Sequence, residues 1–182
     1  MPNESHAAVA VVFREGSHSI EVLLIERAER EGDPWSGHMA FPGGRMEHVD
    51  DSTREAAQRE TFEEVGVDLA NAEYLGQLDD IVGNPKSRPT LVVAAHAFYL
   101  VEHQNFEIDA SEVQTAFWFP LADMLHDSRS VDYKIPGHPE MRYPGILVGT
   151  PDRHVVWGMT YRFLEDLLRV LGHAIPGGSR DS

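Results

Sequence analysis

Residues 41–67, FPGGRMEHVDDSTREAAQRETFEEVGV, decide the fold of this chain. A Pro-Gly-Gly turn leads into an acidic stretch and then into a helix pattern that holds Arg-Glu-x-x-Glu-Glu and stops at Gly66. Because Glu60 and Glu64 are four residues apart and Glu63 is three from Glu60, a helix places the three carboxylates on one side. Like charges at this spacing destabilise a helix slightly, so the arrangement indicates a function.

Carboxylates gathered on one helical face are suited to a hard divalent cation. Mg²⁺ prefers oxygen ligands, keeps several waters and usually bridges carboxylates to substrate phosphates. The alternative is a solvated helix face, which is what a Glu-Glu pair usually means. The neighbouring residues favour the metal site. Gly43 and Gly44 allow a tight turn or a close approach to a ligand, and Arg59 is placed to orient a glutamate.

The segment resembles the Nudix box, in which Gly is followed by five residues, Glu, seven residues and then Arg-Glu-U-x-Glu-Glu-x-Gly-U, with U aliphatic. The second half of the pattern matches at Arg59, Glu60, Glu63, Glu64, Gly66 and Val67. The first half departs from it. Counting back from Arg59 places Asp51 where Glu is expected, and Gly44 is then one residue too far upstream. Thr61 stands at the first aliphatic position.

The resemblance implies an α/β fold, a Nudix-type α/β/α sandwich with a mixed β-sheet, formed by residues 1–182 as a single domain. Hydrophobic patterns agree with it and predict strands at residues 7–13, 20–26, 38–44, 73–82, 91–101 and 113–121, with further strand-like pieces at 143–148 and 153–157. Helices are predicted at residues 53–65, 121–127 and 157–171. In the first helix, the buried side is predicted to hold Ala56, Ala57, Phe62 and Val65. Residues 128–145 are predicted to form a long loop over the pocket, and residues 177–182 a frayed tail.

Composition limits the partners of the chain. Its 182 residues, 42% of them hydrophobic, can bury one sizeable core, and the absence of cysteine excludes disulfides and thiolate metal sites. We expect a cytoplasmic protein without a membrane partner, because the sequence shows neither a long apolar run nor a signal-peptide pattern. The formal net charge of −15 argues against a nucleic-acid partner. A small diphosphate substrate stays compatible with this charge if cations neutralise both sides.

The resemblance also implies a ligand set and a chemistry. The backbone carbonyl of Gly44 and the carboxylates of Glu60, Glu63 and Glu64 would hold Mg²⁺ or Mn²⁺, with Glu63 and Glu64 also in the catalytic set. Metal ions would clamp the diphosphate and acidify a water. Arg59 would hold a glutamate in place, the alternative being an ordinary surface ion pair.

The general base of this family is often supplied from outside the box. The candidate here is Glu112, which precedes a strand ending in Trp-x-Pro-Leu. The alternative is that Glu112 is a solvated loop residue. In that case Asp109 or Glu107 could replace it, or one of the box glutamates could serve as the base.

The segment before the box bears on the substrate. Residues 24–44 resemble the equivalent segment of coenzyme A diphosphatases, with matches at Arg27, Gly37, Phe41, Pro42, Gly43 and Gly44, and residues 156–168 resemble the final helix of that branch. Glu26, Ala28 and Gly32 replace the Thr, Ser and second Arg of that pattern. The resemblance implies coenzyme A or its thioesters as substrate. Arg27, which matches the pattern, and Arg30, which is only a neighbour of the second arginine position, are candidates for binding phosphate, and Phe41 is a further candidate for contact with the substrate. The alternative for the two arginines is a surface role beside Glu26 and Glu29.

Other readings of the sequence stay open. The aromatic residues Trp35, Tyr133, Tyr143 and Trp157 could stack a base or could simply pack in the interior. Lys86 and Arg88 could steer an anionic ligand or solubilise a loop. The substrate could instead be ADP-ribose, another nucleoside diphosphate sugar or a nucleoside triphosphate. A non-catalytic nucleotide-sensing module is a further alternative, although such modules usually lose box glutamates. Homodimers are common in the family, and no pattern in this chain demonstrates one.

Overall fold

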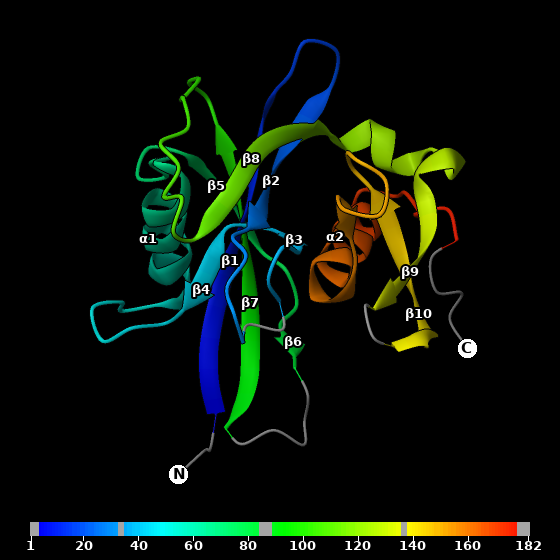
Figure 1. Cartoon of the computed structure of the whole chain (residues 1–182). Helices are drawn as coiled ribbons and strands as arrows, with labels where there is room; N and C mark the ends of the chain where they lie inside the picture. Colours follow the sequence, from blue (N-terminus) through cyan, green and yellow to red (C-terminus); the bar gives the residue numbers. More distant parts are fainter. Residues whose placement is uncertain (1–3, 33–34, 84–88, 136–137, 178–182) are drawn as a thin grey trace.

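A mixed β-sheet with one α-helix against each face forms the centre of the molecule (Figure 1). The structure, a computed structural model, describes residues 4–32, 35–83, 89–135 and 138–177. Lys86, Arg88 and residues 178–182 lie outside these ranges. The strands of the sheet are β1 (Glu4–Glu15), β2 (Ile20–Arg27), β3 (Met39–Ala40), β4 (Gly43–Arg45), β5 (Glu73–Gln77), β6 (Ile81–Val82), β7 (Thr90–Leu100) and β8 (Val113–Pro120).

The strand order explains why the sheet is mixed. The central path runs β3-β2-β1-β7-β5, while β4 pairs with β1, β6 with β7 and β8 with β2. Strands β1 and β7 run parallel from Glu4 opposite Thr90 to Arg14 opposite Leu100, and the other pairs are antiparallel. Both faces of β1 and β7 are covered, which accounts for the apolar runs in their sequences. The predicted mixed sheet between helices is confirmed.

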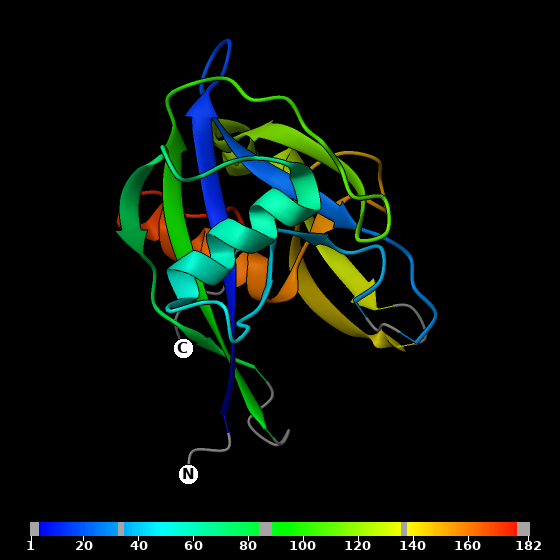
Figure 2. The same cartoon turned by 90° about the vertical axis from the view of Figure 1, so that its left-hand side faces the viewer.

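The two helices cover opposite faces of the sheet. Helix α1 (Thr53–Val65) crosses the face that is nearest the viewer in Figure 2, and α2 (Gly158–Val170) lies behind the sheet. Two separate hydrophobic cores result, one with Ala56, Ala57 and Val65 of α1 and the other with Phe163, Leu164 and Leu168 of α2. Neither helix in the described ranges is long and apolar enough to cross a membrane.

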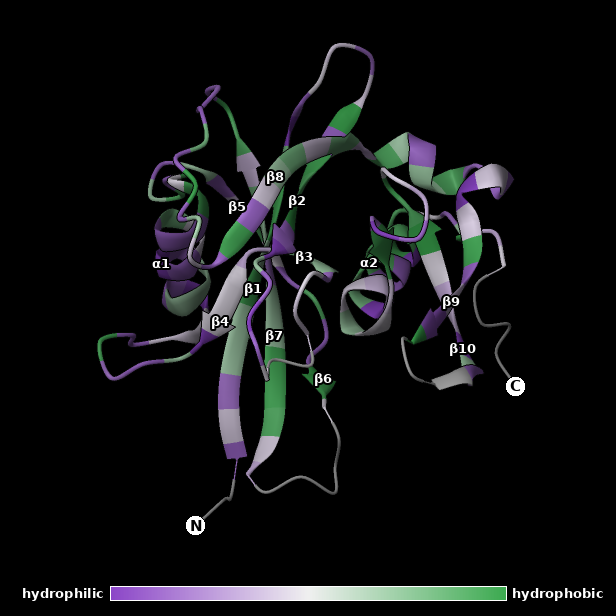
Figure 3. Ribbon diagram, viewed as in Figure 1, coloured by the Kyte–Doolittle hydropathy of each residue, from purple (hydrophilic) through white to green (hydrophobic). Residues whose placement is uncertain are grey.

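Helix α1 begins and ends where its capping residues predict. The Ser52 hydroxyl accepts a hydrogen bond from the Glu55 amide at 3.2 Å, and Gly66, with a φ of 72°, donates its amide to the Phe62 carbonyl at 2.9 Å. The outer surface of the helix is strongly hydrophilic (Figure 3). One prediction for this helix is wrong, because Phe62 is 59% exposed and the buried position beside it is held by Thr61. The Thr61 hydroxyl donates to the Ala57 carbonyl at 2.7 Å, which allows a polar residue to be buried there.

A second, smaller sheet occupies the region predicted to be a long loop. Strands β9 (Ser130–Ile135), β10 (His138–Leu147) and β11 (Val155–Val156) form it in the order β11-β10-β9. The loop prediction for residues 128–145 is therefore wrong. Partly buried and exposed residues alternate along β9, as expected for a strand with one covered face, but proline, glycine and histidine in the sequence obscure this pattern. The predicted helix at 121–127 is replaced by two short 3₁₀ helices, η1 (Leu121–Leu125) and η2 (Asp127–Arg129).

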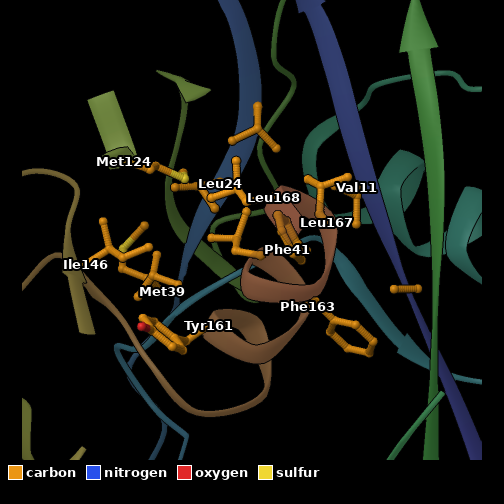
Figure 4. Close-up of a cluster of buried hydrophobic side chains, with 14 of the residues drawn as sticks. Val11, Leu24, Met39, Phe41, Met124, Ile146, Tyr161, Phe163, Leu167 and Leu168 are labelled. Atoms are coloured by element: carbon orange, nitrogen blue, oxygen red, sulfur yellow. The ribbon is translucent and has the colours of Figure 1, made fainter. Parts of the chain in front are cut away.

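Phe41 belongs to the interior of the fold. Its side chain is 2% exposed and packs with Val11, Leu24 and residues of α2 in the core shown in Figure 4. The interpretation of Phe41 as a substrate-contacting residue is corrected accordingly. It follows β3 directly, and its burial anchors the segment that leads to the glycine turn.

Candidate active site

Three carboxylates from two separate parts of the chain meet beside the glycine turn. Glu60 and Glu64 project from α1, and Glu112 stands immediately before β8. Each offers one oxygen, and these three oxygens lie within 4.8 Å of one another. Like charges at this separation repel strongly unless a cation or a proton neutralises them. The cluster is therefore the strongest candidate for a metal centre in the described part of the chain.

Glu64 is the most buried member of this cluster. Its residue is 2% exposed, and its Oε2 accepts a hydrogen bond from the Gly43 amide at 2.9 Å. Burial raises the pKa of Glu64 to about 8, against the opposing effect of the Gly43 hydrogen bond. The charges of Glu60 and Glu112 add to the increase, and that of Arg27 opposes it. A bound cation would favour the ionised form of this carboxylate.

The two glycines of the turn let the backbone approach its neighbours closely. Gly43 has a φ of 152°, and a Cβ on it would overlap the backbone of Ala8 on β1. A Cβ on Gly44 would overlap the carboxyl group of Glu60. Glycine at position 43 therefore allows β4 to run along β1 at this distance, and a Cβ at position 44 would force the Glu60 carboxyl to move.

Backbone contacts fix Glu112 opposite the helix. The Asp109 amide donates to the Glu64 carbonyl at 3.0 Å, which anchors the loop before β8 to the end of α1. The Glu112 carbonyl accepts from the Ala28 amide at 2.8 Å, and the Glu112 side chain remains 46% exposed. Asp109 turns its own carboxylate to Ser111, whose hydrogen bonds lower the pKa of Asp109. Glu107 packs against Gly66, so neither alternative base belongs to the carboxylate cluster.

Arg59 organises the acidic side of the site. Its guanidinium makes a bidentate ion pair with Asp50, with both N–O distances 2.9 Å, and donates a further bond to the Arg45 carbonyl at 3.1 Å. Its Nη1 lies 2.9 Å from both Glu60 Oε1 and Glu63 Oε2. The contact with Asp50 holds the pKa of that carboxyl below its usual range, although burial opposes the change. These contacts place Arg59 as a support for Glu60 and show more than a surface ion pair.

The structure corrects the alignment of the first half of the box. Asp50 is 7% exposed and pairs with Arg59, whereas Asp51 is exposed and contacts Glu55 through its backbone amide. Gly44 and Asp50 are separated by residues 45–49, as in the five-residue spacing of the pattern. The extra residue therefore lies between Asp50 and Arg59, and the prediction that it lies between Gly44 and the acidic residue is wrong.

Glu63 lies at the border of the carboxylate cluster. Its side chain is 57% exposed and bonds to Arg59, and it is not among the three residues whose oxygens meet. Its charge still raises the pKa of Glu60, for which burial is the larger cause. The catalytic and metal-binding roles of Glu63 stay predictions, as does the use of the Gly44 carbonyl as a ligand.

The two predicted phosphate-binding arginines differ in their surroundings. Arg27, the last residue of β2, lies near enough to Glu64 for its charge to lower the pKa of that carboxyl. The guanidinium of Arg30 donates twice to the Ser111 carbonyl, at 2.6 and 3.0 Å, and lies 3.6 Å from the Glu112 carboxylate. Arg30 thus ties the loop after β2 to the candidate base, while its 50% exposure leaves part of it open to a ligand.

Arg153 is the partner of Glu26, a pairing that the sequence does not reveal. It makes a bidentate ion pair with Glu26 at 2.7 and 3.1 Å, and the His154 Nε2 lies 3.4 Å from the same carboxylate. Glu26 is 3% exposed and replaces the Thr of the coenzyme A pattern. A glutamate within a largely apolar strand such as β2 indicates that a positively charged side chain lies beside it. The sequence does not identify this side chain, because Arg153 is 127 residues away.

The residues present fit a hard divalent cation. All three cluster members are oxygen donors, the side chains come from a helix and a loop that are hydrogen-bonded to each other, and Gly44 lies directly against the Glu60 carboxyl. Mg²⁺ and Mn²⁺ prefer such carboxylate sites.

Comparisons with known proteins agree with this site. The sequence profile described as NUDIX domain matches residues 4–136. The peroxisomal coenzyme A diphosphatase ndx-8 of Caenorhabditis elegans is 34% identical over 137 residues, which cover 72% of this chain and 56% of that protein. The human mitochondrial coenzyme A diphosphatase NUDT8 is 28% identical over 152 residues, which cover 82% of this chain and 62% of that protein. A Schizosaccharomyces pombe protein, C14C4.10c, is 44% identical over 108 residues, which cover 57% of this chain and 33% of that protein. The chain thus spans less than two thirds of the length of these relatives.

Solved structures show the same fold. A MutT/nudix family protein from Enterococcus faecalis superimposes with a TM-score of 0.61 at 20% identity, covering 93% of this chain and 62% of that one. The NUDIX domain of Shewanella oneidensis NrtR, solved with ADP ribose, gives a TM-score of 0.54 at 25% identity, covering 67% and 76%. The residues 4–136 that match the family profile include β1, the glycine turn, α1 and the loop that carries Glu112. The chain belongs to the NUDIX domain family.

Proposed function

We propose that this protein is a metal-dependent hydrolase that cleaves the pyrophosphate bond of a nucleoside diphosphate linked to another group. The observation that carries the proposal is the meeting of Glu60, Glu64 and Glu112 within 4.8 Å beside the glycine turn. Three carboxylates held this closely are costly without a cation, and a diphosphate is the ligand that a carboxylate-bound Mg²⁺ commonly shares with a protein. Arg27 and Arg30 supply positive charge at the same place.

The carboxylates of the cluster would have two different roles, metal binding and proton transfer. Glu60 and Glu64 would hold Mg²⁺ or Mn²⁺, which when bound neutralises charge on the diphosphate oxygens and acidifies a water. Glu112 would accept the proton of the water that attacks phosphorus. The oxygen of this water forms the new P–O bond, and the bridging P–O bond breaks with its electron pair on the leaving phosphate.

Arg59 and Gly43 would keep this arrangement ready. Arg59 holds Glu60 from one side, and the Gly43 amide holds Glu64 from the other. Preorganised charges of this kind need no rearrangement when charge develops in the transition state. Glu112, by contrast, is attached through its backbone and keeps an exposed carboxylate, as a base that must reach a water requires.

Coenzyme A or its thioesters is the substrate class that we propose. Two relatives with printed names of coenzyme A diphosphatases align with this chain at 34% and 28% identity. Arg27, Gly37 and the Phe-Pro-Gly-Gly turn also match the pattern of that branch in spacing. ADP-ribose is the second candidate, because the NrtR domain with which this chain shares its fold was solved with ADP ribose.

A substrate panel tests the proposal. The purified protein is incubated with coenzyme A, ADP-ribose, UDP-glucose, NADH and dATP, each with Mg²⁺, with Mn²⁺ and with EDTA, and the products are separated by chromatography. We expect 3′,5′-ADP and phosphopantetheine from coenzyme A, at a higher rate than products from the other compounds. Faster turnover of ADP-ribose or UDP-glucose would reject coenzyme A and keep the hydrolase. The absence of metal-dependent turnover of every compound would count against coenzyme A as the substrate and against the hydrolase activity.

A further inference from the structure

An aromatic cluster lies at the edge of the sheet beside β3. It consists of Trp35, His38, Tyr133, Tyr143 and Trp157, which come from the loop after β2, from β9 and β10 and from the start of α2. The Tyr133 and Trp157 rings stack with centroids 4.5 Å apart, and the rings of His38 and Tyr143 lie 5.0 and 5.5 Å from Trp157. The four aromatic residues that the sequence could not assign to a base or to the interior are thus gathered in one place.

Trp35 is the exposed member of the aromatic cluster. Its indole lies 6.3 Å from Trp157 and 6.0 Å from His38, yet the residue is 53% exposed, whereas Trp157 is 9% exposed. The Trp35 carbonyl accepts from the His38 amide at 3.2 Å, and the neighbouring Ser36 hydroxyl accepts from the Arg30 amide at 2.6 Å. A half-exposed indole with packed rings on one side offers a planar apolar surface to a ligand on the other.

Short backbone contacts connect the aromatic cluster to the carboxylates. The Arg27 amide donates to the His38 carbonyl at 3.0 Å, and on the other side of β2 Arg27 lies opposite Val113, the residue after Glu112. Since neighbouring strands are about 4.8 Å apart, the backbones of His38 and Val113 are separated by about 10 Å. This backbone separation is of the size that a nucleoside diphosphate spans between its phosphates and its base.

We infer that the aromatic cluster is the subsite for the planar base of the nucleotide substrate, with Trp35 stacking on the base. This inference rests on the proposed function, because it assumes that the phosphates lie at Glu60, Glu64 and Glu112. Tyr143 and Trp157 lie beyond residues 4–136, which match the family profile. The C-terminal part of the chain therefore completes the substrate site, and the small sheet positions the rings that select a base.

Binding of two simple probes tests the subsite without turnover. Calorimetric titration with Mg²⁺ compares ADP, which has a base, with inorganic pyrophosphate, which has none. We expect the intact chain to bind ADP more tightly, and Trp35→Ala to weaken ADP binding about 10- to 100-fold without changing the affinity for pyrophosphate. Trp35→Phe should retain most of the affinity for ADP. Trp118→Phe is the matched control, since Trp118 stacks on Phe106 on another part of the sheet.

Each result decides for or against the subsite. Equal affinities for the two probes, an unchanged ADP affinity in Trp35→Ala, or an equal loss for both probes would overturn it, as would the absence of ADP binding. A Trp35-dependent preference for ADP in a protein that hydrolyses nothing would support the subsite and reject the proposed function. Metal-dependent hydrolysis together with an ADP affinity that Trp35→Ala leaves unchanged would support the proposed function and reject the subsite. Circular dichroism of each variant checks that an affinity loss does not come from unfolding.

Discussion

Arg59 and Asp50 form a bidentate ion pair, in which Nε and Nη2 lie 2.9 Å from the two carboxylate oxygens. The Asp50 side chain is 3% exposed and that of Arg59 is 19% exposed, so solvent screens this pair little. The same guanidinium also contacts Glu60 of the carboxylate cluster. The stability of the acidic turn and the position of a candidate metal ligand therefore depend on one arginine.

Asp50→Asn should destabilise the protein and lower its activity, whereas Asp51→Asn should do neither to a comparable extent. Removal of one partner of a buried ion pair costs about 3–5 kcal/mol, and the Arg59 exposure places this case at or below the lower end. Urea unfolding and hydrolysis rates measure the two effects. Asp51 is the matched control because it is the adjacent aspartate and is exposed. Equal effects of the two substitutions would contradict the corrected alignment of the box.

Glu112→Gln should lower kcat by about 100-fold or more, the scale for a positioned general base. Asp109→Asn is the control from the same loop, because the Asp109 carboxylate is turned to Ser111 and lies outside the cluster. Steady-state kinetics of both variants with the preferred substrate and Mn²⁺ measure the difference. A change of less than threefold in Glu112→Gln would remove Glu112 from the mechanism and return the role of base to a box glutamate.

His96 should make the protein less stable as the pH falls below about 6.5, the ordinary pKa of histidine. The ring is buried between the Thr53 hydroxyl at 3.0 Å and the Tyr74 hydroxyl at 3.1 Å. Burial lowers the pKa of His96, the charge of Arg54 lowers it further, and Asp80 opposes them. Between the two pKa values the unfolded chain binds a proton at His96 and the folded chain does not. The stability is therefore fully present above the unfolded-state pKa and declines as the pH falls towards the lower, folded-state pKa.

Urea unfolding at pH 8 and at pH 5.5 measures this effect of His96. The loss of stability on acidification should be smaller in His96→Gln than in the intact chain, by no more than about 1.4 kcal/mol per pH unit. His48→Gln, which changes an exposed histidine, should leave the loss unchanged. The same acid sensitivity in all three proteins would show that His96 does not carry it.

Local signals in the sequence predict the first and the last residue of α1 correctly. Ser52 and Gly66 cap the helix through contacts within a few positions, and the Glu60–Glu64 spacing sets one face regardless of the remaining fold. The prediction for Phe62 is wrong because the buried face of the helix combines apolar residues with the polar Thr61 and Glu64. A hydrophobic pattern cannot reveal a face whose burial depends on hydrogen bonds and on charge.

Long-range pairing accounts for most of what the sequence could not predict. Asp50 and Asp51 are equivalent by spacing alone, and only the position of Arg59 in space distinguishes them. Phe41 matched a family motif, but its burial depends on α2, which lies more than a hundred residues later. The pairing of Glu26 with Arg153 and the gathering of Trp35 with Trp157 likewise join segments that have no common local pattern.

The most direct test of the metal site is the metal-dependent activity of Glu64→Gln beside that of Glu55→Gln. Both glutamates lie on α1, but Glu55 is exposed in the first turn and Glu64 is buried in the carboxylate cluster. Hydrolysis of the preferred substrate is measured with Mn²⁺ and with EDTA, and Mn²⁺ binding is followed by electron paramagnetic resonance. We predict that EDTA abolishes the activity of the intact chain, that Glu64→Gln loses turnover and weakens Mn²⁺ binding while remaining folded, and that Glu55→Gln retains both. Activity and Mn²⁺ binding of Glu64→Gln close to those of the intact chain would contradict the metal site and the mechanism built on it.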